Sequence, residues 1–186
     1  MTDPRIVLLT GDIGNKLFDQ FKDGSKERFF NCGIAEANMM GVAAGMALSG
    51  LRPIVYTITP FTTTRCYEQI RVDACYHNVP VIIVGTGSGL SYAELGPTHH
   101  SLEDLAIMRV LPNMTVLAPA DEVDLLQCLR AALKLKGPVY MRIGKKGEKT
   151  TTKNDDKFEI GRSITVREGS DICLISTGTL LPTVME

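Results

Sequence analysis

The sequence predicts an α/β domain with three layers, in which helices cover both faces of one parallel sheet. Two observations carry this prediction: short apolar runs alternate with helical segments, and most of the runs are apolar at every position. A strand that is apolar on both sides has to be covered on both faces. Regular alternation of strand and helix is typical of parallel connections. In such folds, ligands bind beyond the carboxyl ends of the strands.

The expected strands share short runs of mostly apolar side chains. They cover residues 6–9, 28–32, 53–58, 80–84, 114–117 and 138–141. Functional residues are expected just beyond their carboxyl ends. Those ends lie near Thr10, Asn31, Thr59, Gly85, Ala118 and Arg142.

The segments between the strands carry helical signals. We expect helices over residues 16–21, 35–49 and 64–76, one that begins at Ser101, and one over 121–136. In the third of these segments, Tyr67, Ile70 and Ala74 recur at helical spacing and therefore share one face.

The last two helices have boundary signals of their own. Ser101 precedes Asp104 by three residues, a variant of the capping box that marks a helix start. Gly137 provides a C-terminal signal for the final helix. The leucines expected on one side of that helix are Leu126, Leu129 and Leu133.

The chain is expected to contain more than one structural unit. Residues 1–143 form the predicted α/β domain, and the Lys-, Thr-, Asp- and Gly-rich residues 144–160 read as a linker. Two further strands, 163–166 and 172–176, then predict the start of a second domain over 161–186. This pattern suggests part of a larger polypeptide.

Composition excludes several classes of protein. The chain has 186 residues, and its 20 Lys plus Arg against 21 Asp plus Glu give a net charge of −1. A nucleic-acid-binding surface would show a basic excess. The 44% of hydrophobic residues also excludes a disordered chain.

The cysteines are expected to be reduced, buried thiols. They form no C-x-x-C pair and share no metal-ligand spacing with the histidines. They are Cys32, Cys66, Cys75, Cys128 and Cys173. The N-terminus lacks the features of a signal peptide, and no apolar stretch is long enough to cross a bilayer, so we expect a cytoplasmic chain.

Glu36 is the first candidate functional residue. It follows a strand end and a glycine turn, in the first turn of an expected helix whose next residues, 39–48, carry no charge. Acidic residues favour helix N-termini for electrostatic reasons alone, so a purely structural role is a strong alternative. A helix without charges is expected to be buried all round, as at a subunit interface. Burial would then favour the protonated form of the carboxyl group, which suits proton transfer.

Other candidates lie near the ends of later strands. The run Gly85-Thr86-Gly87-Ser88-Gly89 fails the dinucleotide fingerprint because residue 90 is leucine and no helix pattern follows. His99 and His100 are adjacent, so at most one is expected to reach a shared site. Phe61 and Arg142 complete the set, with a core aromatic and a surface cation as the structural alternatives.

Taken together, these motifs resemble the pyrimidine-binding domain of transketolase, especially of split transketolases whose domains lie on separate polypeptides. The resemblance covers most of the chain, in order. Its motifs are residues 31–39 (N-C-G-I-A-E-A-N-M), 65–71 (R-C-Y-E-Q-I-R), 96–99 (G-P-T-H), 103–106 (E-D-L-A), 111–113 (L-P-N) and 119–121 (P-A-D). It implies the thiamine diphosphate-binding fold.

The resemblance also implies cofactor chemistry and roles for particular residues. In this family the carboxylate that matches Glu36 hydrogen-bonds the aminopyrimidine of thiamine diphosphate, and a two-carbon unit passes from a ketose to an aldose. Phe61 matches the aromatic that packs on the aminopyrimidine, and Ile34 is assigned to the same cofactor site. His99 matches a substrate-facing histidine and Arg142 an arginine that binds the sugar phosphate.

Some family features are absent from this sequence. The diphosphate and Mg²⁺ motif, G-D-G followed by asparagine, is not matched, because Ile13 stands where its second glycine belongs. We therefore expect no metal site of the chain's own, and a partner N-terminal transketolase subunit or section that holds diphosphate and Mg²⁺. Leu95 and about Gly87 replace a sugar-contacting aspartate and a histidine, which leaves the sugars open. The alternatives are a non-catalytic structural or regulatory subunit, and an enzyme acting on a 2-oxo acid, either deoxyxylulose-phosphate synthase-like or a 2-oxo-acid dehydrogenase β-type component.

Overall fold

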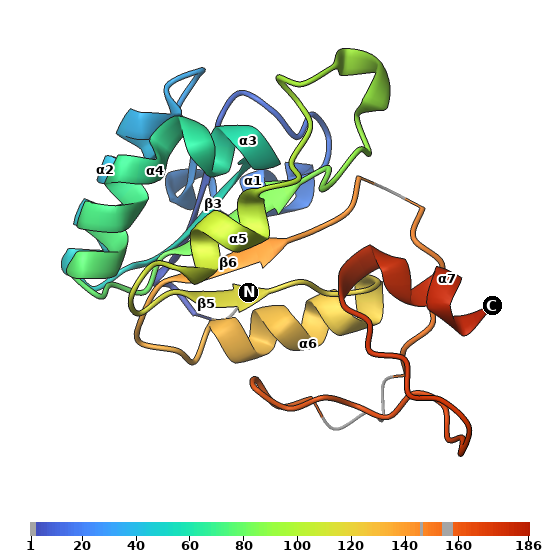
Figure 1. Cartoon of the computed structure of the whole chain (residues 1–186). Helices are drawn as coiled ribbons and strands as arrows, with labels where there is room; N and C mark the ends of the chain where they lie inside the picture. Colours follow the sequence, from blue (N-terminus) through green and yellow to red (C-terminus); the bar gives the residue numbers. More distant parts are fainter. Residues whose placement is uncertain (1–2, 146, 154–157) are drawn as a thin grey trace.

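The computed structural model describes residues 3–145, 147–153 and 158–186. Its centre is a six-stranded sheet in the order β2-β1-β3-β4-β6-β5, in which every pair is parallel. The strands are β1 (Ile6–Thr10), β2 (Phe29–Asn31), β3 (Arg52–Ile58), β4 (Ile82–Thr86), β5 (Thr115–Leu117) and β6 (Val139–Arg142). Figure 1 shows helices packed around this sheet. The predicted three-layer α/β fold is confirmed.

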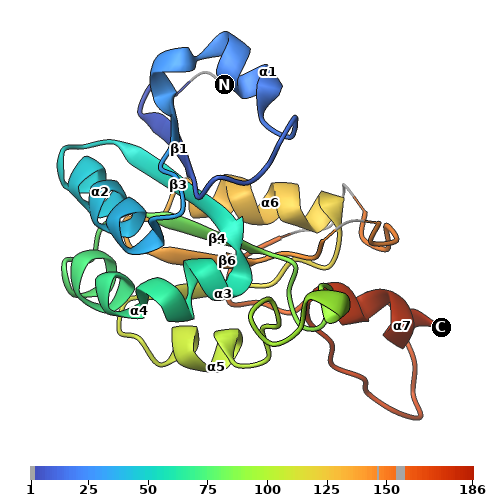
Figure 2. The same ribbon diagram turned by 90° about the horizontal axis from the view of Figure 1, so that it is seen from above.

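The central strands are buried on both faces, as their sequences predict. Every residue of β1 and β4 is buried. Figure 2 shows α1 and α6 on one face of the sheet and α2, α4 and α5 on the other. The strands all point the same way, so their carboxyl ends meet at one edge of the sheet.

The larger of two hydrophobic clusters lies on the face that α2, α4 and α5 cover. Fully buried Met39, Ile70 and Tyr140 lie in it with strand residues Leu9 and Ile83. The covering helices are α2 (Glu36–Leu48), α3 (Thr59–Thr62), η2 (Thr64–Cys66), α4 (Tyr67–Gln69), η3 (Ile70–Tyr76) and α5 (Asp104–Arg109).

The predicted helix over 64–76 is present, but it is not regular. It passes from a 3₁₀ turn into a short α-helix and then into the π-helical η3. The predicted apolar face is confirmed, because Ile70 and Ala74 are 0% exposed and Tyr67 packs against the same cluster.

Within this chain, helix α2 is buried on one side only, and the expectation that a subunit interface covers the rest stays a prediction. Ala43, Ala44 and Ala47 lie in the core, where their small side chains let the helix approach the sheet closely. Val42 and Leu48 face outward, and Leu48 is 63% exposed. A single sheet packs against one side of a helix, and among the described residues nothing covers the other.

The opposite face of the sheet is covered by α1 (Asp19–Gly24) with η1 (Lys26–Arg28) and by α6 (Glu122–Ala132). Phe18, just before α1, meets Tyr56 of β3 edge to face, with ring centroids 5.0 Å apart. Between α1 and α6 lies a mostly apolar cavity of about 570 Å³ floored by strand side chains such as Leu8 and Val84.

The predicted face of α6 is confirmed for Leu129 and Leu133 and is wrong for Leu126. Leu126 is 44% exposed, whereas Leu125 and Leu129 pack against the smaller hydrophobic cluster with buried Cys128. A period of 3.6 residues allows either leucine as a neighbour of Leu129, and only packing decides between them. The helix also ends at Ala132, well before Gly137.

Two other helix starts differ from their predictions. Lys16 has a φ of 65°, outside the helical region, so α1 begins at Asp19 instead of at residue 16. Ser101 forms an isolated antiparallel bridge with Gly89, so α5 begins at Asp104 and has no side-chain cap. Strand-like pairing at Ser101 is incompatible with a helix start there.

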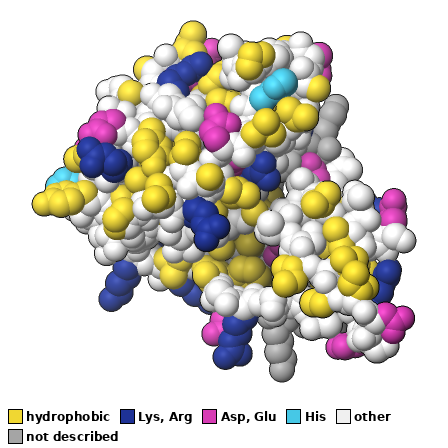
Figure 3. All heavy atoms as spheres, viewed as in Figure 1, with side chains coloured by type: hydrophobic (Ala, Val, Ile, Leu, Met, Phe, Trp, Pro, Cys, Tyr) yellow, Lys and Arg dark blue, Asp and Glu magenta, His cyan; other side chains and the backbone are white. Residues whose placement is uncertain are grey.

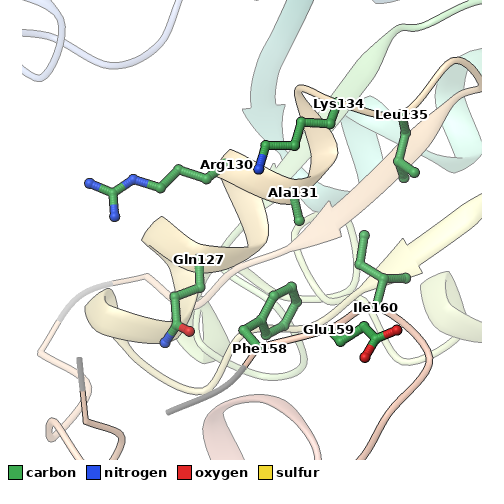
Figure 4. Close-up of a pocket in the computed structure, with 8 residues that line it drawn as sticks. All are labelled: Gln127, Arg130, Ala131, Lys134, Leu135, Phe158, Glu159 and Ile160. Carbon is green, nitrogen blue, oxygen red and sulfur yellow. The ribbon is translucent and has the colours of Figure 1, made fainter. Parts of the chain in front are cut away.

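The two strands predicted after the linker are wrong. Within the described part of this segment, residues 163–166 and 172–176 have no pairing strand and stay largely exposed. Phe158 and Ile160 lie against α6, as Figure 4 shows. Figure 3 shows hydrophobic side chains on the surface of the C-terminal segment, which ends in η5 (Gly178–Leu180) and α7 (Leu181–Met185). The division into domain, linker and second domain stays a prediction.

The cysteines follow their prediction in part. Cys66, Cys75 and Cys128 are buried free thiols, and burial raises the pKa of Cys66 to about 12. Cys32 is half-buried and Cys173 is exposed, so the expectation of burial is wrong for both. No helix in the described part of the chain is long and apolar enough to cross a membrane.

Asp121 ties the segment after β6 to the start of α6. Its carboxylate caps the helix by accepting hydrogen bonds from the N–H groups of Val123 and Asp124, both at 3.1 Å. It also accepts from the N–H groups of Thr151 at 2.7 Å and Thr152 at 2.8 Å, and from both threonine hydroxyls. Burial alone would raise its pKa, but these hydrogen bonds outweigh burial and hold the pKa of Asp121 well below its usual value.

We expect Asp121→Ala to lower the free energy of unfolding by about 2 kcal/mol at pH 7, because the variant loses the helix cap and the hydrogen bonds to Thr151 and Thr152 together. The pKa is lowered in the folded state, so the stabilisation is present above the ordinary value of 3.8 and is lost as the pH falls below it. Urea unfolding between pH 7 and pH 3 measures both effects. Glu122→Gln, at the next position, is the control, and an equal pH dependence for Asp121→Ala and wild type would contradict the assignment.

Candidate functional site

The candidate site lies at the carboxyl edge of the sheet, and Glu36 is a buried carboxylate within it. Strand β2 ends at Asn31, Gly33 turns the chain with a φ of 67°, and Glu36 is the first residue of α2. Its side chain is 2% exposed. The carboxylate therefore lies at the positive end of a helix dipole and out of contact with bulk water.

Arg65 is the partner of this carboxylate. Its Nη1 donates a hydrogen bond to Oε1 of Glu36 at 2.8 Å. The Arg65 side chain is 45% exposed, so the pair joins a buried anion to a cation at the surface. The buried negative charge of Glu36 therefore has a cationic partner.

Phe61 lies beside this pair. Pro60 occupies the first turn of α3, where a missing N–H costs nothing, and Phe61 follows it. The guanidinium carbon of Arg65 lies 3.8 Å from the centroid of the Phe61 ring, a cation–π arrangement. The same ring meets the imidazole of His99 with centroids 5.2 Å apart and planes at 67°.

His99 is carried by a lobe that we call the His99 lobe, residues 87–103. Figure 1 shows it between β4 and α5, projecting beyond the sheet edge. Thr98 Oγ1 lies 2.9 Å from Nδ1 of His99, and the Tyr92 ring lies 5.8 Å from its ring. Lys145 places its Nζ 4.2 Å from the Tyr92 centroid, so a cation also lies near the lobe.

Arg142 lies at the end of β6, where its side chain is mostly buried and hydrogen-bonded. Its Nε donates to Oδ2 of Asp104 at 2.9 Å, and its Nη2 donates to the carbonyl of Ser101 at 3.3 Å. Its side chain is 19% exposed and that of Asp104 is 1% exposed. The sequence therefore places Arg142 correctly at the edge but misses that a buried carboxylate holds it.

The structure brings together three of the five predicted residues. Glu36, Phe61 and His99 form a chain of contacts through Arg65. Ile34 precedes Glu36 by two residues and is 80% exposed. Arg142 connects with the His99 lobe through Ser101.

Sequence reasoning missed the roles of Arg65 and Asp104. Arg65 stands in a motif that was noted, and its position four residues after Phe61 was the available signal. Asp104 was assigned to a helix cap, whereas its carboxylate accepts from Tyr140 and Arg142. No group of three or more His, Cys, Asp or Glu side chains placed to hold a metal ion is present among the described residues.

Comparison with known proteins identifies the family. A family model described as "Transketolase, pyrimidine binding domain" matches residues 1–148. The chain belongs to this family. It is 37% identical, over 95% of its length, to a putative transketolase C-terminal section of Methanocaldococcus jannaschii, and it spans 57% of that protein.

Two further relatives widen the comparison. The domain is 37% identical to part of the 1-deoxy-D-xylulose-5-phosphate synthase of Syntrophomonas wolfei, covering 95% of this chain and 28% of that enzyme. A solved structure described as a split gene transketolase, inactive β4 tetramer, is 38% identical. It superposes with a TM-score of 0.89 over 98% of this chain and 60% of that one. This transketolase-type domain thus spans a little over half of the split relatives.

We expect Arg65→Ala to lower the free energy of unfolding by about 1–2 kcal/mol, because it leaves the Glu36 carboxylate buried without its cation. This loss of stability is smaller than the loss expected for a fully buried ion pair, because Arg65 is half-exposed. Chemical unfolding of the variant measures it.

Arg71→Ala is the matched control. Arg71 pairs with Glu68 at the same 2.8 Å, but both side chains are more than half exposed, so its loss should cost under about 0.5 kcal/mol. Equal losses for the two variants would show that Arg65 does not compensate a buried charge.

Proposed function

We propose that this chain is the pyrimidine-binding part of a thiamine diphosphate-dependent transketolase. The reaction transfers a two-carbon ketol unit from a ketose or ketose phosphate to an aldose or aldose phosphate. The observation that carries the proposal is the buried carboxylate of Glu36 at the start of α2, beside an aromatic ring and a histidine at the carboxyl edge of the sheet. The similarity to a transketolase C-terminal section supports it.

The residues fit the aminopyrimidine end of the cofactor. A ring nitrogen that shares a proton needs a carboxylate shielded from water, and the Glu36 side chain is 2% exposed. Phe61 offers a flat apolar surface, and Ile34 offers an exposed aliphatic side chain near Glu36 in the sequence. Bound thiamine diphosphate supplies the carbanion chemistry, while Glu36 holds the proton and Phe61 and Ile34 orient the ring.

Arg65 occupies part of this site in the structure. Its guanidinium lies over the Phe61 ring while it donates to Glu36. A planar ring stacked on that side of Phe61 would take the place of the guanidinium. We propose that Arg65 gives up one or both contacts when the cofactor binds.

His99 and Arg142 are the proposed substrate residues. His99 contacts the Phe61 ring and can therefore face a substrate bound next to the cofactor. Arg142 can meet a sugar phosphate only with the guanidinium N–H groups that its hydrogen bonds to Asp104 and Ser101 leave. Leu95, where the family has a sugar-contacting aspartate, is 49% exposed in the same lobe. The sugar pair is therefore not specified by these residues.

The rest of the active site is proposed to come from a partner. A transketolase N-terminal subunit or section would hold the diphosphate and Mg²⁺, and catalysis would occur at the interface of a hetero- or homo-oligomer. The name of one relative, a putative transketolase C-terminal section, supports this division. We propose a cytoplasmic location, as for an enzyme that acts on sugar phosphates.

One alternative activity has a specific observation in its favour. The similarity to a deoxyxylulose-phosphate synthase covers nearly the whole chain, so a 2-oxo acid donor is the second candidate. A 2-oxo-acid dehydrogenase β-type component shares the glutamate and the fold but is disfavoured by the Gly96-Pro97-Thr98-His99 motif. A non-catalytic subunit would have little need for a buried carboxylate at this edge.

We expect Glu36→Gln to abolish turnover while the fold survives. The amide keeps the shape of the side chain but cannot exchange a proton, and loss of a general acid–base group costs roughly 10²–10⁴-fold in kcat. Ketol transfer by the complex with the diphosphate-binding partner measures the loss, and circular dichroism checks the fold.

Glu68→Gln is the control, because Glu68 is an exposed carboxylate of α4 paired with Arg71. Turnover in Glu36→Gln within about threefold of wild type would reject the mechanism.

A further inference from the structure

Four side chains meet beneath the base of the His99 lobe, and we call them the Asp104 cluster: Ser101, Asp104, Tyr140 and Arg142. Tyr140 Oη donates to Oδ2 of Asp104 at 2.6 Å, and Arg142 Nε donates to the same oxygen at 2.9 Å. Ser101 Oγ donates to Oδ1 at 3.4 Å. Both oxygens of this carboxylate therefore have donors.

The charges of the cluster are matched. A buried carboxylate is stable only when it is paired and hydrogen-bonded, and Arg142 provides the opposite charge to Asp104. Burial, followed by the negative charge of Asp104, raises the pKa of Tyr140 well above its usual value. The Tyr140 hydroxyl therefore stays protonated and keeps donating.

On one side, the cluster closes the His99 lobe. Ser101 and Gly89 exchange two backbone hydrogen bonds, at 3.0 and 3.1 Å, which brings the two arms of the lobe together. Arg142 Nη2 donates to the carbonyl of Ser101, two residues after His99. Asp104 thus holds the arginine that holds the base of the lobe.

On the other side, the cluster reaches α3. The Tyr140 hydroxyl, Thr59 Oγ1 and Thr62 Oγ1 crowd around Gly85, and a Cβ added there would lie 3.0–3.1 Å from all three. The Thr59 hydroxyl donates to the carbonyl of Thr86 at 3.0 Å, so Tyr140 meets α3 by close packing at Gly85. Thr59 and Thr62 are the two ends of α3, which carries Phe61.

We propose that Asp104 and Tyr140 are positioning residues that set the spacing between Phe61 and His99. They act through α3 on one side and through Arg142 and Ser101 on the other, so the two rings meet at 5.2 Å without contact from Asp104 or Tyr140 themselves. The catalytic consequence of this inference rests on the proposed transketolase function, whereas the structural link does not.

The first test is hydrogen–deuterium exchange on the Tyr140→Phe variant. This change removes one hydroxyl and keeps the ring that fills the core. We expect amide exchange in residues 87–103 and 59–62 to become at least about tenfold faster, while exchange in α2 and α6 is unchanged. Tyr67→Phe is the matched control, because it removes a hydroxyl that donates to the Ile107 carbonyl of α5 at 2.8 Å and makes no bond to the Asp104 cluster. Exchange in the lobe that equals wild type, or that equals Tyr67→Phe, would overturn the proposal.

The second test is kinetic and uses the complex with its diphosphate-binding partner. A displacement of about 1 Å in a positioned group can cost up to about 100-fold in rate, so we expect kcat of Tyr140→Phe to fall about 10- to 100-fold. Cofactor affinity should fall much less than kcat, since the Glu36 carboxylate lies outside the loosened segments. An equal loss of cofactor affinity and kcat would indicate general destabilisation and contradict a positioning role.

Asp104→Asn provides a second variant if Tyr140→Phe does not fold. It keeps an acceptor for the cluster but removes the charge that holds Arg142, and the same lobe-specific increase in exchange is expected. If wild type shows no ketol transfer, the proposed function fails, and the exchange experiment still decides whether the cluster positions the lobe.

Discussion

All six strands run in the same direction, and the candidate site is a consequence of that constraint. Parallel strands have their carboxyl ends at one edge, and every connection that leaves this edge begins with a loop there. Three such connections are the turn at Gly33 before α2, the segment that enters α3, and the His99 lobe. Residues that are far apart in the sequence, such as Glu36 and His99, are therefore neighbours through Arg65 and Phe61.

Two buried carboxylates lie at this edge, and their environments differ. Asp104 has donors on both oxygens and a cation with little exposure, which makes it a fixed structural anion. Glu36 is bound by an arginine that is itself half-exposed, so its partner can leave for solvent at low cost. This difference fits the roles proposed for them, Glu36 as the cofactor-facing residue and Asp104 as a positioning residue.

The fold was predictable because its signals are local. Apolar runs such as residues 80–84 predict the strands, because such runs need cover on both faces of a sheet. The sequence failed where packing or pairing between distant residues decides the outcome. Leu125 and Leu126 are equally compatible with a helical period, and Ser101 pairs with Gly89 instead of capping a helix. Strand-like runs at 163–166 and 172–176 find no partner in the described structure, since a strand needs a second strand beside it.

Glu36, Phe61 and His99 were placed correctly at one edge of the sheet, whereas the state of Arg142 was not foreseen. An arginine at the end of a strand gives no sign of which carboxylate it meets, because Asp104 is 38 residues away in the chain. Arg65 was missed for the same reason, since its contact with Glu36 joins two helices that only the fold brings together.

The central claim is that this chain provides the pyrimidine end of a shared cofactor site. Calorimetric titration of thiamine diphosphate with Mg²⁺ tests it most directly, with this chain alone and mixed with a diphosphate-binding transketolase section. The account predicts binding heat only in the mixture. Tight binding by the chain alone, or none in a mixture whose assembly has been verified, would contradict it.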